Sequence, residues 1–236
     1  MRRLAVILVA LAAVTAGPAA APAPGDVGFA PVLHRFLSRA DEPLNTYRGT
    51  RRLEGRNEKF NISAWMDIAT ELSADGFHYR VLRDGGSDLI RGRVFRAMLA
   101  NEEQIFATGD AARSAISSNN YELTPADSAE PGLVKLLARP KRNDVTLING
   151  AVYVTDSDAD LVRVEGRLAK SPSFWTRRVD VVKQYTRVAG LRVPVRIESV
   201  AQIRFAGTST MTMTYDYEMI NGVDVSSAGA VTGLAR

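Results

Sequence analysis

Apolar and polar residues alternate over long stretches in the second half of the chain. Between residues 191 and 205, and again between 208 and 219, most alternate side chains are apolar. A period of two places successive side chains on opposite faces of a β-strand, so each stretch predicts a strand with one apolar and one polar face. Ala189-Gly190 and Ala206-Gly207 have the length of tight turns, which makes these strands neighbours in an antiparallel meander.

The same alternation predicts further strands at 133–138, 161–169 and 178–188. Asn149-Gly150 lies between two apolar runs, 145–148 and 151–154. Both residues tolerate a positive φ angle, so we expect a two-residue β-hairpin turn at this position. From residue 133 onward the pattern therefore predicts strands and turns alone.

The first half of the chain mixes the two periods. Apolar residues at helical spacing predict one amphipathic helix over 27–39 and a second over 89–106. Ser87 or Asp88 is the expected cap of the second helix, which should end before Gly109. Three strands are expected between the helices, at 47–54, 60–72 and 77–82. Residues 110–131 are rich in Ser, Asn, Ala and Pro, and they predict a loop with a short strand near Tyr121.

The predicted sheet has a wide apolar face, and the two helices are the cover that the sequence offers for it. An incompletely filled apolar concavity is a binding site for an apolar ligand. An ordinary filled core fits the pattern equally well. The sequence leaves both interpretations open, because hydrophobic periodicity does not report cavities.

The first residues have the features of an export signal. Arg2 and Arg3 precede an apolar run over residues 4–14, and small residues and prolines follow. A short basic head, an apolar stretch and small residues at its end are typical of a secretory signal peptide. The run is shorter than the ~20 residues that a membrane-spanning helix needs. We therefore expect residues 1–20 to be a signal peptide cleaved near Ala19, and 21–236 to form a single periplasmic domain.

Composition excludes several kinds of chemistry. The 236-residue chain has no cysteine, which excludes disulfides, thiolate metal sites, cysteine nucleophiles and a lipid-modified N-terminal cysteine. Neither of its two histidines, His34 and His78, is near a recognisable nucleophile motif, so we expect no enzyme, metal or cofactor. Cleavage of the signal leaves 28 basic residues against 26 acidic ones. Charge therefore gives no reason to expect nucleic-acid binding.

Phe174 and Trp175 follow a turn between two predicted strands. They are either an exposed aromatic lip, at a pocket mouth or a membrane interface, or a plug that closes one end of the core. We favour the plug, because buried aromatic residues are common core material.

Several segments resemble the LolA/LolB/RseB-like superfamily of bacterial envelope proteins. The resemblance covers about residues 26–222 and rests on Tyr47–Thr50, on 88–102 and on 156–221, with consecutive strands at 161–166 and 193–199. It implies an unclosed β-barrel wrapped around helices, with a hydrophobic cavity that binds acyl chains of lipids or lipoproteins. A LolB-type receptor is itself lipid-anchored, which a chain without cysteine cannot be. The resemblance therefore points to a carrier or sensor.

Together these observations predict an α+β fold in which a large curved antiparallel sheet, an unclosed β-barrel, wraps around two or more helices. The predicted function is binding of an acyl chain by a monomeric carrier or sensor, with an envelope membrane protein as a second candidate partner. The alternative is an envelope protein-interaction or regulatory module with a filled core. The expected ligand-binding residues are Ile62, Met66, Ile68, Val195, Ile197, Ile203, Met211, Met213 and Tyr215 on the sheet and Leu89, Val94 and Met98 in the covering helix.

Overall fold

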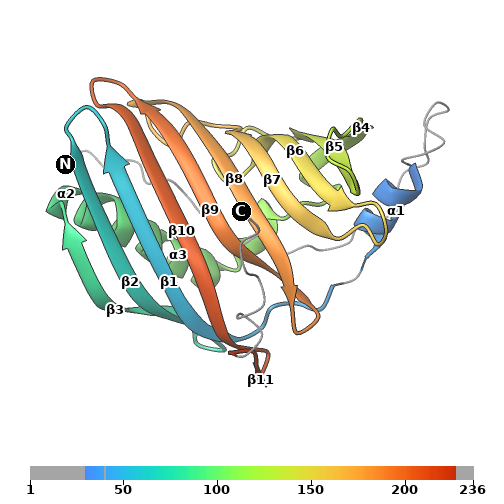
Figure 1. The fold of residues 1–236 in the computed structure, drawn as a ribbon, viewed down its shortest axis with the longest axis horizontal. Helices are drawn as coiled ribbons and strands as arrows, with labels where there is room; N and C mark the ends of the chain where they lie inside the picture. The colour runs from blue at the N-terminus through green and yellow to red at the C-terminus, as the bar shows by residue number, and fades with distance from the viewer. Residues whose placement is uncertain (1–29, 40, 227–236) are drawn as a thin grey trace.

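The structure, a computed structural model, describes residues 30–39 and 41–226, and a single antiparallel sheet of 11 strands dominates it (Figure 1). The predicted signal peptide lies outside the described residues. At one edge of the sheet, β1 (Tyr47–Asn57), β2 (Ile62–Ser73) and β3 (Gly76–Gly86) form a meander. The chain then crosses to the other edge and returns through β4 (Tyr121–Ala126), β5 (Leu133–Pro140), β6 (Ile148–Thr155), β7 (Leu161–Leu168), β8 (Thr176–Val188), β9 (Leu191–Ile203) and β10 (Gly207–Ile220).

Pairing of β10 with β1 joins the two meanders into one sheet. The strand order is β3-β2-β1-β10-β9-β8-β7-β6-β5-β4, and the short β11 (Val223–Asp224) pairs with β10. Within the described residues β3 and β4 are the two edges, so the sheet curves as a barrel that does not close. The predicted fold class, an α+β fold with a large unclosed antiparallel sheet around two helices, is confirmed.

The helices cover one face of this sheet. α1 (Ala30–Ser38) corresponds to the first predicted helix, whose expected residues 27–29 lie outside the described part. The second consists of α2 (Asp88–Ile90), the π-helical η1 (Arg91–Arg96) and α3 (Ala97–Thr108), which follow one another without a break. Figure 1 shows α2 and α3 behind β1, β2 and β10. In the described part of the chain, no helix is both long enough and apolar enough to cross a membrane.

Gly109 ends the second helix as predicted, because its left-handed φ of 69° is a conformation that glycine adopts at little cost. The short 3-10 helix η2 (Asp110–Ser114) follows and leads into the segment before β4. Ala115, Ile116 and Ser117 of that segment are buried. The predicted loop thus includes a buried stretch as well as the short strand expected near Tyr121.

The predicted hairpin turn at Asn149-Gly150 is wrong. β6 runs through both residues and pairs with β7, which places Gly150 opposite Gly166. A Cβ atom at position 150 would lie 2.1 Å from the carbonyl oxygen of Glu165. Glycine is required here because two backbones approach closely, and not because the chain turns.

We expect Gly150→Ala to lower the free energy of unfolding by about 1–3 kcal/mol or more, because the new methyl group must push β6 and β7 apart. Urea denaturation of the variant and the wild type would measure the loss. Gly92→Ala is the matched control, since a Cβ atom there has no neighbour within 4 Å. Alanine in this helical position should stabilise the protein by about 0.5–1 kcal/mol. Equal stability of Gly150→Ala and wild type would contradict the close strand approach.

Candidate functional site

The twelve predicted ligand-binding residues do not share one environment. Those in the core cluster, each at most 4 % exposed, are Met66, Ile68, Met98, Ile197, Met211 and Met213. Those that are half-buried and pack against that cluster are Ile62, Val94, Ile203 and Tyr215. Val195 is half-buried, and Leu89 is exposed. The structure therefore brings ten of the twelve together between the sheet and its helices.

Leu89 points away from the core, and its neighbour Ile90 is buried together with Phe95. The helical segment is π-helical over Arg91–Arg96. A π-helical turn holds more residues than an α-helical one, so it changes which side chains face the sheet. Helical spacing also distinguishes the two residues, because Ile90, Val94 and Met98 follow one another at intervals of four and share one side of the helix, whereas Leu89 does not belong to that series.

Gly55 of β1 lets this helical segment pack closely against the strand. A Cβ atom at position 55 would lie 3.1 Å from side-chain atoms of both Ile90 and Phe95. That spacing is tighter than ordinary van der Waals contact, so the missing side chain lets the helix lie close to the strand. Phe95 is fully buried there, beneath the strand pair β1–β2.

A buried ion pair joins α3 to β1 further along the helix. The Arg51 guanidinium donates two hydrogen bonds to the Glu102 carboxylate, with Nη1–Oε2 at 2.7 Å and Nη2–Oε1 at 2.9 Å. Both side chains are about as buried as the apolar residues around them, at 1 % and 2 % exposure. Bidentate geometry of this kind is the strongest form of arginine–carboxylate contact.

Aromatic side chains surround the Arg51 guanidinium. Its Cζ atom lies 4.6 Å from the Tyr215 ring centroid and 4.9 Å from that of Phe77, and Nη2 donates to the Tyr47 hydroxyl oxygen. Burial by itself would lower the pKa of Arg51, but the Glu102 carboxylate opposes this and holds that pKa well above its usual value. Burial raises the pKa of Tyr47 to about 12, although the charge of Arg51 acts in the other direction. At neutral pH the site therefore holds a charged arginine and a neutral tyrosine.

A second buried cation lies on β8. Lys183 is 6 % exposed and is paired in register with Ile197 on β9, a residue of the apolar cluster. Burial lowers its pKa from 10.5 to about 8, and the Glu102 carboxylate acts in the opposite direction. Near neutral pH the apolar interior thus contains two cations and the carboxylate of Glu102.

Arg51, Glu102 and Lys183 were not predicted as site residues. A signal for Arg51 was present, because Tyr47, Arg51 and Leu53 fall on the same, buried face of β1. Glu102 likewise follows Met98 by four residues, which places it on the same side of a helix. A charged residue in phase with an apolar face predicts a buried ion pair, although the pattern does not identify its partner.

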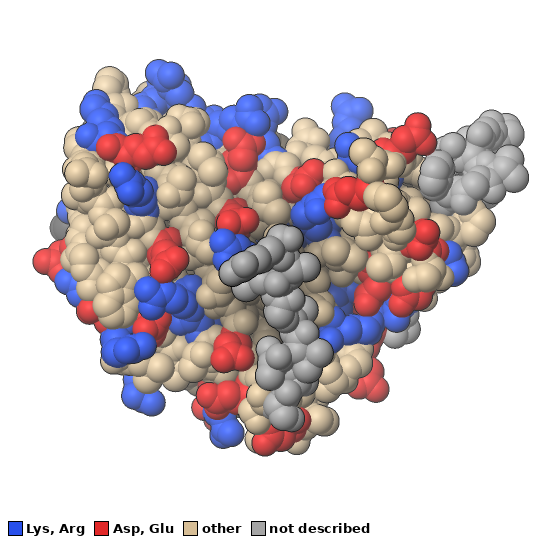
Figure 2. Space-filling view, in the orientation of Figure 1, with Lys and Arg blue, Asp and Glu red and all other residues tan. Residues whose placement is uncertain are grey.

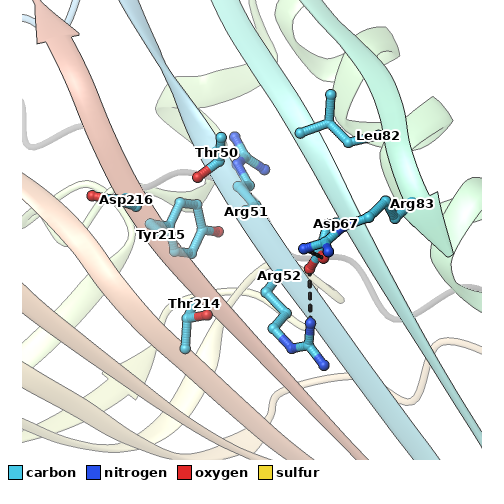
Figure 3. A pocket seen from close by; sticks show the side chains of 9 residues that line it. All are labelled: Thr50, Arg51, Arg52, Asp67, Leu82, Arg83, Thr214, Tyr215 and Asp216. Atoms are coloured by element: carbon cyan, nitrogen blue, oxygen red, sulfur yellow. Dashed lines mark hydrogen bonds and ion pairs between the residues drawn. The ribbon is translucent and has the colours of Figure 1, made fainter.

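The polar face of the sheet carries two shallow depressions. One, of about 380 Å³, is lined by residues of β1, β2, β3 and β10 (Figure 3). In it Asp67 lies 3.0 Å from both Arg52 and Arg83. The other, of about 330 Å³, lies beside it around Trp65. Five of the nine side chains that line the first depression are charged, so it does not have the apolar lining that an acyl chain needs.

Phe174 and Trp175 do not close the core, so the favoured plug interpretation is wrong. Phe174 is 74 % exposed and Trp175 is 38 % exposed. Their rings contact each other at the surface, with centroids 5.4 Å apart. The core is closed without them by aliphatic residues of β8 and β9 such as Val179 and Ala201.

The fold and the site define a class of structure: an unclosed antiparallel β-barrel whose concave apolar face is covered by helices. No family model matches the chain, and no curated protein matches it. Solved structures to which this chain is similar include three proteins from different bacteria. A LolA superfamily protein from Nitrosomonas europaea is 12% identical, with a TM-score of 0.37 over 80% of this chain and 92% of the other.

The second is a putative outer membrane lipoprotein-sorting protein domain from Vibrio parahaemolyticus, 11% identical, with a TM-score of 0.40 over 82% of this chain and 93% of the other. The third is a DUF1329 family protein from Desulfovibrio piger, 10% identical, with a TM-score of 0.37 over 82% and 91%. The similarity is confined to the fold.

Proposed function

We propose that this protein binds the acyl chain of a lipid or lipoprotein between its curved sheet and the helical segment 88–108, as an exported carrier or sensor. The observation that supports the proposal is a large apolar concave face covered by the helical segment 88–108. Ten of the predicted lining residues lie there, on the three strands β2, β9 and β10 and in the helical segment 88–108. The apolar residues of this lining favour a role in binding.

The composition of the lining favours a flexible ligand. Met66, Met98, Met211 and Met213 lie together in the core cluster. Methionine side chains are unbranched and polarizable, so they repack around ligands of different shape. A linear acyl chain that takes the place of the helix would gain about 0.8 kcal/mol for each methylene group removed from water.

The way in which the helix is attached supports a displacement mechanism. α3 is joined to β1 by the Arg51–Glu102 pair, and its residues Met98 and Leu99 belong to the apolar cluster between the helices and the sheet. An acyl chain replaces apolar contacts with apolar contacts, so the exchange costs little. The hydrogen bonds between Arg51 and Glu102 must break before the helix can move. We therefore call this ion pair the latch of the closed state.

Quenching by a brominated fatty acid tests this proposal. Phe95→Trp in a background with Trp65→Phe and Trp175→Phe places a single fluorophore under the helix. Dibromostearic acid should quench this tryptophan saturably, and fatty acids of increasing chain length should compete more strongly, because each methylene adds burial.

The matched control keeps Trp65 as the single tryptophan, on the polar face beside Arg52. Dibromostearic acid should leave its emission unchanged. Binding without quenching of the tryptophan at 95, or equal quenching of both reporters, would place the ligand elsewhere and overturn the proposal.

The filled-core alternative has one observation in its favour, namely that the six most buried lining residues already pack against one another at no more than 4 % exposure. In that case the protein would act through its surface on an envelope partner. Absence of saturable binding across the whole range of fatty acids, with the fold intact, would favour this second function.

A further inference from the structure

Four exposed aromatic residues gather at one end of the sheet. Phe205, in the β9–β10 hairpin, is 78 % exposed, and Phe60, in the β1–β2 hairpin, is 55 % exposed. Phe174 and Trp175 lie in the β7–β8 loop. Exposed aromatic side chains that cluster in this way mark an interaction site rather than ordinary surface.

Direct contacts tie the three loops into one structure. The Arg204 amide donates to the Trp175 carbonyl oxygen at 2.7 Å, and Lys59 Nζ donates to the Phe205 carbonyl oxygen at 2.8 Å. The Trp175 and Phe205 rings lie 5.9 Å apart between centroids. The loops therefore present their aromatic side chains as a fixed set, which we call the aromatic tip.

The backbone conformation of Phe205 holds its ring in this exposed position on the hairpin. Its φ of 67° lies in the left-handed region, which a bulky residue rarely adopts. Gly207, the first residue of β10, also has a positive φ, of 68°. The hairpin thus holds an aromatic ring out in solvent at a position where a smaller, polar residue is the usual choice.

Basic residues surround the aromatic tip. The segments 56–61, 169–178 and 203–207 together contain six basic residues and one acidic residue. Arg178 pairs with Asp180, and Arg204 lies 4.9 Å above the Phe174 ring. Figure 2 shows Lys and Arg side chains along the upper edge of the molecule, the edge at which Figure 1 draws the β1–β2 and β9–β10 hairpins.

We propose that the aromatic tip docks the protein on the surface of a bilayer that contains anionic lipid. Aromatic rings partition into the headgroup region of a membrane, and nearby Lys and Arg side chains are attracted to anionic headgroups. The four residues lie in three loops at one end of the sheet, a position that suits shallow insertion into a soft interface. This inference does not rest on the proposed acyl-chain binding, since the tip and the concave core are separate surfaces.

Tryptophan fluorescence with lipid vesicles tests the docking. Trp65→Phe leaves Trp175 as the single tryptophan of the full mature chain. Vesicles of phosphatidylcholine with phosphatidylglycerol should shift its emission to shorter wavelength, and brominated phosphatidylcholine in the same vesicles should quench it. Pure phosphatidylcholine vesicles, or added salt, should weaken the binding, because screening removes the attraction between the basic residues and the lipid.

Phe174→Ser/Phe205→Ser should lower the vesicle partition coefficient by about tenfold or more, because burial of these rings in the interface is lost. Val223→Ser is the control, since Val223 is an exposed apolar residue on β11, which Figure 1 draws at the opposite end of the sheet. It should leave the partition coefficient unchanged.

Three outcomes would overturn the docking proposal: no binding to anionic vesicles, unaltered binding by the double phenylalanine variant, or capture of a protein partner that needs Phe174 and Phe205 while vesicles do not bind. Fatty-acid binding by the double phenylalanine variant, measured with the reporter at 95, should stay intact. A failure of the docking proposal is therefore distinguishable from a failure of the proposed function.

Discussion

Glu102→Gln is expected to lower the free energy of unfolding by about 3–5 kcal/mol, because it leaves the charge of Arg51 buried without its carboxylate partner. Arg51 and Glu102 are both almost completely removed from solvent. The glutamine keeps the size of the side chain, so the loss reports the charge rather than a cavity. Chemical denaturation at neutral pH measures it. Amide hydrogen exchange of residues 97–108 should also become faster, because the helix loses its polar attachment to β1.

Glu103→Gln is the matched control for this substitution. Glu103 is the next residue on the same helix, but it is half-exposed, so its replacement should cost less than ~0.5 kcal/mol. A second test replaces both partners. Arg51→Met/Glu102→Leu should recover most of the lost stability, since apolar residues in place of a buried ion pair are often neutral or stabilising. A Glu102→Gln protein as stable as the wild type would show that the pair does not hold the helix.

The double variant also connects the latch to function. If the Arg51–Glu102 pair keeps the concave face closed, then its replacement in the double variant should leave the fold intact and let a fatty acid enter faster. We expect the pair to select the closed arrangement more than to add net stability, because the desolvation of two charges offsets much of their attraction.

The order of strands and helices could be predicted from the sequence because the two periods are clear over long segments. Met211 and Met213 alternate with threonines, and they are buried on β10 as the pattern predicts. The error at Asn149-Gly150 has a different cause. Glycine meets two needs, a turn and a close approach between strands, and the sequence around Gly150 does not show that Gly166 lies opposite.

The site was less predictable than the fold because its decisive residues act in pairs. Arg51 and Glu102 lie 51 positions apart in the chain, and only the packing of α3 on β1 brings them together. The exposed state of Phe174 and Trp175 has a similar origin, since it depends on how three loops meet at one end of the sheet. Hydrophobic periodicity describes single elements, so it cannot report contacts between distant ones.

Lys183→Met is expected to change how the free energy of unfolding depends on pH between about pH 8 and pH 10.5. In the folded protein the pKa of Lys183 is about 8, whereas its ordinary value is 10.5. Between these values the unfolded chain binds the proton more strongly, so the contribution of Lys183 to stability rises with pH. That contribution is fully present above 10.5 and is lost as pH falls toward 8. The free energy of unfolding of wild type, relative to Lys183→Met, should therefore increase by on the order of 3 kcal/mol from pH 7.5 to pH 10.5.

Urea denaturation of both proteins across this range measures the difference, and the comparison cancels groups that they share, including the buried tyrosines whose raised pKa values act at higher pH. Lys141→Met, at an exposed position, should show no such pH-dependent difference from wild type.

Glu102→Gln should extend this pH range to lower values, because the Glu102 carboxylate raises the pKa of Lys183 and the substitution removes that effect. A wild-type profile parallel to that of Lys183→Met would mean that Lys183 is solvated in solution, and hence that the interior opens between the sheet and α3 more readily than the closed structure indicates.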